Sequence, residues 1–311
     1  MGEGLVFKKL AQRTKWRRTG MMVEIALVAS LMVGAGGIQY IKVAAKRQTA
    51  QENRFFDLAS QVMAPNIQSS DQFISNNGLV TTQLTSHRYK QIEGQRIPWS
   101  PMVATYSWWG GAPLPTRLNS LDGDRSSYDV VTQQKVPVFY NDHRRLDKGE
   151  PRQLAVQEVQ QVARNRGYVA EAALSFEHPL TYQQIRQKLP VGVHPAWYWL
   201  GVTGDADTTL MDNNFLGIQA ETAQGSLTTR GYQEFRQQLA QASRSGFSLT
   251  YGTFNVFQYA GKYAKKHPTL ATARFAGAIV TGESSRFKAL DQAAWVEASS
   301  VGVFQRQQTI R

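Results

Sequence analysis

Histidine and carboxylate side chains, the usual ligands of a metal ion, are spread widely along this chain. None of the five histidines has a second histidine at the spacing that places two ligands on one helix face. They are His87, His143, His178, His194 and His267. Three carboxylates gather at Asp205, Asp207 and Asp212, but the segment lacks the glycine and the terminal glutamate of a calcium loop. We therefore expect a solvated loop there and no metal site.

A serine nucleophile is the next chemistry that the residues could support. Ser285 and Lys288 match the Ser-x-x-Lys spacing in which a lysine activates a serine, but no Lys-Thr-Gly or Ser-x-Asn segment stands at a suitable place. Residues 282–285 could present N–H groups to an anion at a helix start, although ordinary helix capping explains these residues better. Gly-x-Ser-x-Gly and phosphate-loop motifs are also missing. We predict no catalytic residue, no cofactor and no enzymatic activity.

Tryptophans form the remaining candidate site. Exposed aromatic side chains bind glycans, lipids or peptides, whereas aromatic residues on strands are mostly core. Trp197 and Trp199 lie on an expected strand, which favours the core. We predict a surface aromatic site formed by Trp99, Trp108 and Trp109, with core packing as the alternative.

One long apolar segment indicates that the chain is located at a membrane. Residues 19–41 contain only three polar side chains after the first residue, and at 1.5 Å per residue they can cross a bilayer core of about 30 Å. Six basic residues precede this segment within residues 8–18, and three follow within residues 42–47. This asymmetry places the N-terminus in the cytoplasm and the rest of the chain outside. We predict a single-pass protein of the cell membrane.

A cleaved signal peptide is the alternative interpretation of the same segment. The apolar run is longer than in most signal peptides, and its small residues at 34–37 are followed by more apolar chain. The chain has no cysteine, which excludes a lipoprotein cleavage site. These features favour an uncleaved anchor.

Small residues recur along one stripe of the expected membrane helix. Ala26, Ser30 and Gly34 are spaced by four residues, and small side chains at this spacing let two helices approach closely. The stripe could therefore form a homodimer or contact a partner helix. Such stripes also occur in helices that only tolerate small residues, so this alternative stays open. Glu24 lies near the cytoplasmic end and can reach the interface.

Positive charge is concentrated next to the membrane segment. The formal net charge is +12, from 35 Lys and Arg against 23 Asp and Glu. Nine of the basic and two of the acidic residues lie within residues 1–47, which leaves 26 basic and 21 acidic residues, a net charge of +5, for the remainder. Such flanking charge attracts anionic lipid headgroups. No basic stripe with interleaved aromatic residues follows, so we expect the lipid bilayer as a partner and no nucleic acid.

Shifts in composition divide the chain into five predicted segments. The exported part of about 260 residues is large enough to bury its own cores without a disulfide. The segments are a cytoplasmic basic stub at 1–18, a transmembrane helix at 19–41, a juxtamembrane helix at 42–64, a β-rich extracytoplasmic region with a polar linker at 65–153, and an α+β domain at 154–311.

The last segment contains a strand–helix–strand pattern that occurs twice. The first copy has strands near 168–176 and 196–202 around a helix that Thr181 caps, and the second begins at residue 275. This order is typical of a split β-α-β arrangement. We predict an α+β sandwich with a duplicated, ferredoxin-like pattern, its sheet covered by helices on one face, and two further helices near 231–242 and 254–265.

The order of short motifs along the chain resembles the sigma factor regulator family of Gram-positive bacteria. The motifs follow the basic segment and the membrane helix, and they are Met63-Ala-Pro65-Asn66-Ile67, Tyr89-Lys90-Gln-Ile92-Glu93-Gly94, Ile97-Pro98-Trp99, Glu171-Ala-Ala-Leu174-Ser175-Phe176, Trp197-Tyr198-Trp199 and Ala278-Ile279-Val280-Thr281-Gly282. The resemblance implies a single-pass protein with a C-terminal extracytoplasmic domain and no catalysis. Some members of this family restrain an extracytoplasmic-function sigma factor as anti-sigma factors.

Three functions remain at this point. The first is a membrane-anchored regulator that acts on an extracytoplasmic-function sigma factor or on a partner membrane anti-sigma protein. The partner protein is considered because only about eighteen residues precede the helix, and so short a peptide cannot bury a core with which to bind a sigma factor. The second is a cell-surface module that binds wall glycan or lipid through the tryptophans. The third is a wall-acting hydrolase, for which no acid/base pair stands out.

Overall fold

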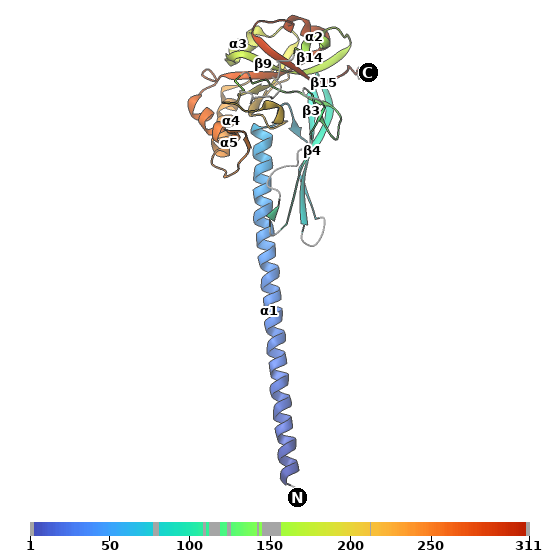
Figure 1. Cartoon of the computed structure of the whole chain (residues 1–311), viewed down its shortest axis with the longest axis vertical. Coiled ribbons are helices and arrows are strands. Elements are labelled where there is room, and N and C mark those ends of the chain that lie inside the picture. The colour runs from blue at the N-terminus through green and yellow to red at the C-terminus, as the bar shows by residue number, and fades with distance from the viewer. Residues whose placement is uncertain are drawn as a thin grey trace, which may run out of the picture.

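A long helix carries a head of sheets and helices at its C-terminal end (Figure 1). The structure is a computed structural model. It describes residues 3–76, 81–107, 110–111, 119–122, 126–141, 143–144, 157–211 and 213–308.

Helix α1 (Glu3–Val62) is continuous over 60 residues and joins the predicted stub, span and juxtamembrane helix. No proline interrupts it, and Pro65 follows its end, since proline lacks the N–H that a helix needs and restricts the residue before it. At 1.5 Å per residue the helix is about 90 Å long. It is the one helix among the described residues that is long and apolar enough to cross a membrane, and the apolar part lies entirely outside the packed head.

A first antiparallel sheet lies beside the upper part of α1. Its strands β3 and β4 form a long hairpin whose turn residues Glu93 and Gly94 have φ angles of 47° and 79°. Positive φ at both central positions is what a two-residue hairpin turn of type I′ requires. The strands are β1 (Gln68–Ser69), β2 (Phe73–Asn76), β3 (Thr81–Ile92), β4 (Gln95–Ser107) and β5 (Gly110–Gly111), in the order β1-β3-β4-β5, with β2 paired to β3.

The main sheet has the order β11-β10-β14-β9-β15, and every neighbouring pair is antiparallel. Strand β14 therefore separates β9 from β10, and β9 separates β14 from β15. The 3₁₀ helix η2 connects β14 to β15, and α3 connects β9 to β10, so two strand–helix–strand units interleave. The elements are β9 (Tyr168–Leu180), α3 (Tyr182–Lys188), β10 (Val193–Trp199), β11 (Gly217–Gln219), β14 (Phe275–Glu283), η2 (Ser284–Leu290) and β15 (Val296–Arg306).

Local sequence signals explain the start of α3. Thr181 accepts a hydrogen bond from the N–H of Gln184, and the Gln184 side chain accepts one from the Thr181 N–H, which is a complete capping box. The predicted cap is confirmed. The remaining elements are β6 (Asn119–Asp122), β7 (Ser126–Asp129), β8 (Lys135–Val136), α2 (Val159–Ala163), η1 (Thr208–Leu210), α4 (Thr229–Ala242), β12 (Thr250–Tyr251), β13 (Phe254–Asn255) and α5 (Val256–Lys266).

Both faces of the main sheet are covered. On β9 all residues from Val169 to Phe176 are buried, whichever face they point to. Helices α2 and α3 lie above the sheet in Figure 1, and the end of α1 lies below it with α4 and α5. The expectation of helices on one face only is wrong, because the end of α1 lies with α4 and α5 on the second face.

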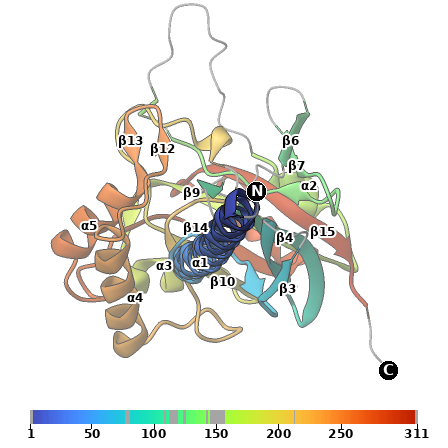
Figure 2. The ribbon, with the colours of Figure 1, turned by 90° about the horizontal axis from the view of Figure 1, so that it is seen from below.

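The end of α1 is part of the main hydrophobic core. Seen from below, α1 lies between the α4–α5 pair and the β3–β4 hairpin (Figure 2). One cluster contains Phe55 and Val62 of α1, Tyr106 of β4, Leu174 of β9 and Phe257 of α5. Residues of the juxtamembrane, β-rich and α+β segments thus share one core.

Candidate functional site

The predicted helix stripe lies on the exposed part of α1. Ala26, Ser30 and Gly34 are all solvent-exposed in the single chain. A Cβ atom added at Gly34 would meet nothing within 4 Å. The stripe is therefore open to a second helix, and its role as a helix contact stays a prediction.

Trp99 belongs to the core and not to an exposed aromatic surface. Its side chain is 3% exposed and packs with Ile92, Ile97 and Val303, because the pairing of β4 with β3 turns it inward. The prediction of a surface site is wrong for this residue. Trp108 and Trp109 lie outside the described residues. Trp197 and Trp199 are 1% and 2% exposed and are core residues, as their strand pattern indicates.

No metal centre forms within the described part of the chain. It contains no group of three or more histidine, cysteine, aspartate or glutamate residues that could hold an ion. Asp205 instead accepts a hydrogen bond from Thr253 Oγ1 at 2.6 Å, and Asp207 pairs with Arg144 at 3.0 Å. Asp212 lies outside the described residues.

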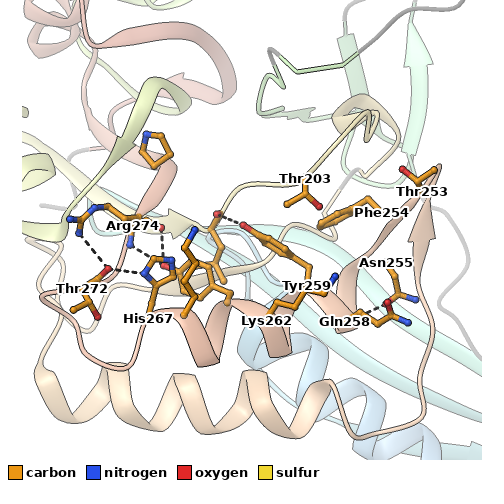
Figure 3. A pocket seen from close by; sticks show the side chains of 14 residues that line it. Thr203, Thr253, Phe254, Asn255, Gln258, Tyr259, Lys262, His267, Thr272 and Arg274 are labelled. Atoms are coloured by element: carbon orange, nitrogen blue, oxygen red, sulfur yellow. Dashed lines mark hydrogen bonds between the residues drawn. The ribbon is translucent and has the colours of Figure 1, made fainter.

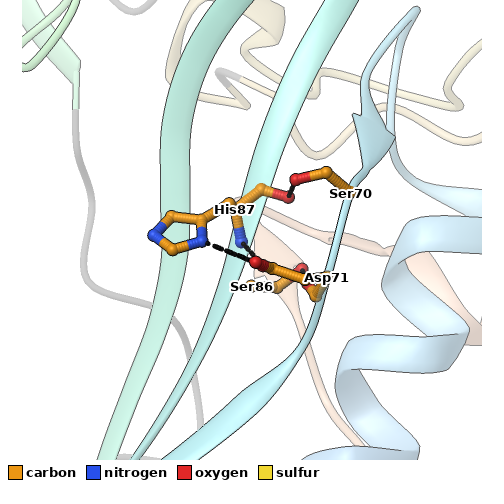
Figure 4. Close-up of polar contacts among 4 residues, drawn as sticks. All are labelled: Ser70, Asp71, Ser86 and His87. Carbon is orange, nitrogen blue, oxygen red and sulfur yellow. Dashed lines mark hydrogen bonds and ion pairs between the residues drawn. The ribbon is translucent and has the colours of Figure 1, made fainter.

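His87 forms a surface contact that holds the chain together near β2. Its Nδ1 and its backbone N–H lie 2.9 and 3.1 Å from Asp71 Oδ1 (Figure 4). Ser70 Oγ donates to the His87 carbonyl, and Ser86 Oγ donates to the Asp71 carbonyl. Both bonds from His87 hold the pKa of the Asp71 carboxyl below its usual range. These contacts attach the segment before β2 to strand β3.

The chain that leaves α1 reaches the main sheet through a buried polar contact. Asn66 Nδ2 donates a hydrogen bond to Glu171 Oε1 at 2.7 Å, and the two side chains are 1% and 0% exposed. Asn66 has a φ angle of 53°, in the left-handed region that asparagine tolerates better than most residues. This turn after Pro65 directs the amide to strand β9. The end of α1 is therefore bonded to the centre of the head.

Glu171 also holds the only lysine in the buried core that the structure describes. Lys90 Nζ of strand β3 lies 2.7 Å from Glu171 Oε2, and both side chains are 0% exposed. The ammonium lies 4.0 Å from the centre of the Trp99 ring, which adds a cation–π contact. Burial lowers the pKa of Lys90, and the Glu171 carboxylate opposes this shift.

The carboxylate of Glu171 requires a glycine on the neighbouring strand. A Cβ atom added at Gly302 of β15 would lie 2.6 Å from Glu171 Oε2 and 2.8 Å from Pro137 Cδ. The groups around the carboxylate of Glu171 thus come from the segment after α1, from β3 and from β15. One buried charge connects the N-terminal and C-terminal parts of the chain.

Aromatic side chains and a hydroxyl hold the last turns of α1 on two sides. The Phe55 ring lies edge-on to Phe247 at 5.1 Å and to Phe257 of α5 at 6.4 Å. On the other side, Tyr106 of β4 donates a hydrogen bond to Thr49 Oγ1 at 2.9 Å. Any displacement of α1 relative to the head would have to disturb these contacts.

Sequence reasoning did not identify Asn66, Lys90 and Glu171 as a site. The sequence does contain one indication of a buried charge, because Glu171 interrupts a run of apolar residues at a core position of β9. A buried carboxylate needs a partner charge or several hydrogen bonds. The identity of the partner depends on the tertiary fold, since Lys90 stands 81 residues earlier in the sequence.

Comparison with known proteins identifies two matching family models. The model described as sigma factor regulator N-terminal matches residues 8–97, and the model described as sigma factor regulator C-terminal matches residues 164–303. No curated protein and no solved structure matches the chain. The buried pair joins the two matched regions, because Lys90 lies in the first and Glu171 in the second.

Proposed function

We propose that this chain, which belongs to the sigma factor regulator family, is a membrane-anchored regulator whose head controls an extracytoplasmic-function sigma factor through helix α1. The family is regulatory and not catalytic. One observation carries the proposal: the helix with the apolar span is the same helix whose last turns are buried in the head. A change in the head can therefore reach the membrane without an intervening hinge.

The proposed orientation places the N-terminus in the cytoplasm and the head outside. Its support is the excess of Lys and Arg within residues 8–18, since cytoplasmic flanks carry more basic residues than exported ones. The apolar segment at 19–41 would contact lipid. The stripe of Ala26, Ser30 and Gly34 would contact a second copy of the helix or a partner membrane anti-sigma protein.

The proposed transmission is a rigid-body movement of α1. The contacts of Phe55, Thr49 and Asn66 hold the helix to the head on several sides. Packed interfaces of this kind switch between discrete arrangements and do not deform continuously. A rotation or shift imposed on the head would thus move residues 1–18 relative to the sigma factor or its partner protein.

A duplicated, ferredoxin-like arrangement is part of the proposal for the main sheet. The strand order β10-β14-β9-β15 with alternating directions supports it, together with the two connections through α3 and η2. The edge strand β11 and the helices α4 and α5 are additions to that pattern. The second connection is a 3₁₀ helix and not an α-helix.

The alternative of a cell-surface module for wall glycan or lipid is less well supported. It was built on Trp99, Trp108 and Trp109, and the first of these is buried. No other observation on the described residues favours this alternative.

A transcription reporter tests the regulatory function. We expect deletion of the chain to raise expression from promoters that depend on its sigma factor, and the full chain supplied in trans to restore repression. A deletion strain whose expression profile equals that of the parent strain, both with and without envelope stress, would contradict the proposal.

Thiol labelling tests the orientation separately. The chain has no cysteine, so single substitutions Arg17→Cys and Gln241→Cys create unique labels on either side of the span. Both positions are exposed. We expect a membrane-impermeant maleimide to label the second variant in intact cells and the first only after lysis. The reverse pattern would show the opposite orientation.

A further inference from the structure

The largest described pocket of the head lies along helix α5 (Figure 3). Its volume of about 830 Å³ is in the range of cavities that hold small molecules. It is lined by Pro179, Leu200, Thr203, Thr253, Phe254, Asn255, Gln258, Tyr259, Lys262, Tyr263, Lys266, His267, Thr272 and Arg274.

The charge of this pocket is positive, although the carboxylate of Asp205 accepts a hydrogen bond from the lining residue Thr253. Lys262, Lys266 and Arg274 line it and are exposed, and none of its described lining residues is an aspartate or a glutamate. In the described part of the chain none of the three cations pairs with a carboxylate. Three cations of one sign in a hollow create a field that attracts an anion.

The floor of the pocket is aromatic and polar. Tyr259, Tyr263 and His267 follow one another at intervals of four residues along α5 and beyond its end, with ring centres 6.3 and 4.5 Å apart. Their polar atoms are occupied by the protein itself, since Tyr259 Oη donates to the Leu200 carbonyl and Tyr263 Oη to the Arg274 carbonyl. The half-buried Tyr259 ring therefore offers flat apolar surface, whereas Tyr263 and His267 are buried beneath it. Lys262 and Lys266 at the rim offer positive charge, and Arg274 adds a third charge while its Nη1 donates to the Thr272 and Ala273 carbonyls.

The positive charges of the pocket also act on the imidazole ring of His267. Its Nδ1 lies 2.7 Å from the Thr272 carbonyl and so carries the hydrogen, which leaves Nε2 as the acceptor of a neutral ring. Burial is the main reason why the pKa of His267 is lowered, and Lys266 and Arg274 add to this effect. A bound anion would act in the opposite direction, because a nearby negative charge favours the imidazolium.

We propose that this pocket binds a small organic anion, a ring compound with one carboxylate or phosphate group. The anionic group would lie among Lys262, Lys266 and Arg274, and the ring would cover the face of Tyr259. The volume exceeds what an inorganic ion alone needs, and the aromatic floor gives a carbon skeleton something to pack against. Arginine and lysine bind both carboxylate and phosphate through charge-assisted hydrogen bonds.

The opposite face of α5 contacts the membrane helix. Phe257 is buried and lies edge-on to Phe55 of α1. A ligand on the exposed face of α5 is thus separated from α1 by one helix. That the ligand regulates the sigma factor rests on the proposed function, whereas binding itself does not.

Calorimetry on the full chain in lipid nanodiscs tests the binding. The probes are glucuronate, which carries a carboxylate, glucose 6-phosphate, which carries a phosphate, and glucose as the neutral control. We expect one or both anions to bind, with an affinity that falls as salt rises, and glucose not to bind. The two anionic probes distinguish a carboxylate from a phosphate ligand.

Matched variants identify the pocket. The double variant Lys262→Ala/Lys266→Ala should weaken binding at least about tenfold, since it removes two charge-assisted contacts. The control Lys265→Ala removes an exposed lysine of the same helix that does not line the pocket, and it should bind as the native chain does. A thermal unfolding curve for each variant confirms that it folds.

Three results would overturn the proposal: no binding of either anion at millimolar concentration, equal binding of glucose, or the same loss in the Lys265→Ala control. None of them depends on the sigma-factor reporter, so failure of binding and failure of the regulatory function are distinguished.

Discussion

The substitution Glu171→Gln isolates the charge of the buried carboxylate. A glutamine at this position keeps an oxygen that can accept from Asn66, but it turns an N–H₂ group toward the Lys90 ammonium 2.7 Å away. Because both side chains are 0% exposed, water cannot take over the role of the carboxylate. Breaking a buried ion pair by removing one partner costs about 3–5 kcal/mol.

For Glu171→Gln we expect a cost at the lower end of this range of about 3–5 kcal/mol. Burial already lowers the pKa of Lys90, so the lysine can lose its proton once its partner is gone, and this limits the cost. We therefore expect a loss of about 3 kcal/mol, which lowers the midpoint of thermal unfolding by about 6–12 °C for a folded unit of this size. Thermal unfolding of the full chain in detergent, followed by tryptophan fluorescence, measures this change.

Two further variants separate the charge effect from general damage. In Lys90→Met/Glu171→Gln no charge remains buried, and we expect most of the stability to return. Glu234→Gln breaks the exposed pair of Arg230 and Glu234, whose side chains are 90% and 56% exposed, and it should change stability by less than about 0.5 kcal/mol. If Glu171→Gln costs no more than Glu234→Gln, or if the double variant is as unstable as the single one, the buried charge of Glu171 does not stabilise the fold in this way.

Three other predictions follow from contacts in the structure. Asp71→Asn should lower the unfolding temperature at pH 7, because the pKa of the Asp71 carboxyl is depressed in the folded chain and the carboxylate therefore stabilises it above the unfolded pKa near 4. This contribution disappears as the pH falls through the folded pKa, so the difference between variant and native chain should shrink in melting curves recorded at successively lower pH. Gly302→Ala should cost about 1–3 kcal/mol, because its Cβ would meet Glu171, and chemical denaturation measures the loss. Gly34→Leu should reduce helix–helix cross-linking in the membrane, and an unchanged yield would remove the stripe from the contact.

Local features of the structure could be predicted from the sequence. The apolar span, the end of the helix before Pro65 and the capping role of Thr181 each depend on neighbours in the sequence. Strand positions near 168–176 and 275–280 were also predicted from alternating or apolar runs, and they correspond to β9 and β14. These features are governed by backbone chemistry and by side-chain periodicity.

Features that depend on distant contacts were missed. The direction of Trp99 is determined by the pairing of β4 with β3 and by the strands that cover it. The pairing of Lys90 with Glu171 joins positions 81 residues apart, and neither residue type indicates its partner. Coverage of both sheet faces likewise depends on where the end of α1 packs. Patterns of neighbouring residues in the sequence do not indicate which distant segments will pack together.

The central claim is that α1 transmits the state of the head as a rigid helix, and a series of insertions after Lys42, between span and head, tests it most directly. Two added alanines rotate the span by about 200° relative to the head, whereas seven added residues restore the phase to within about 20°. With the sigma-dependent reporter we predict that two alanines change the response to envelope stress and that seven restore it. An equal response from both insertions would show that the helix is only a tether and would contradict this account.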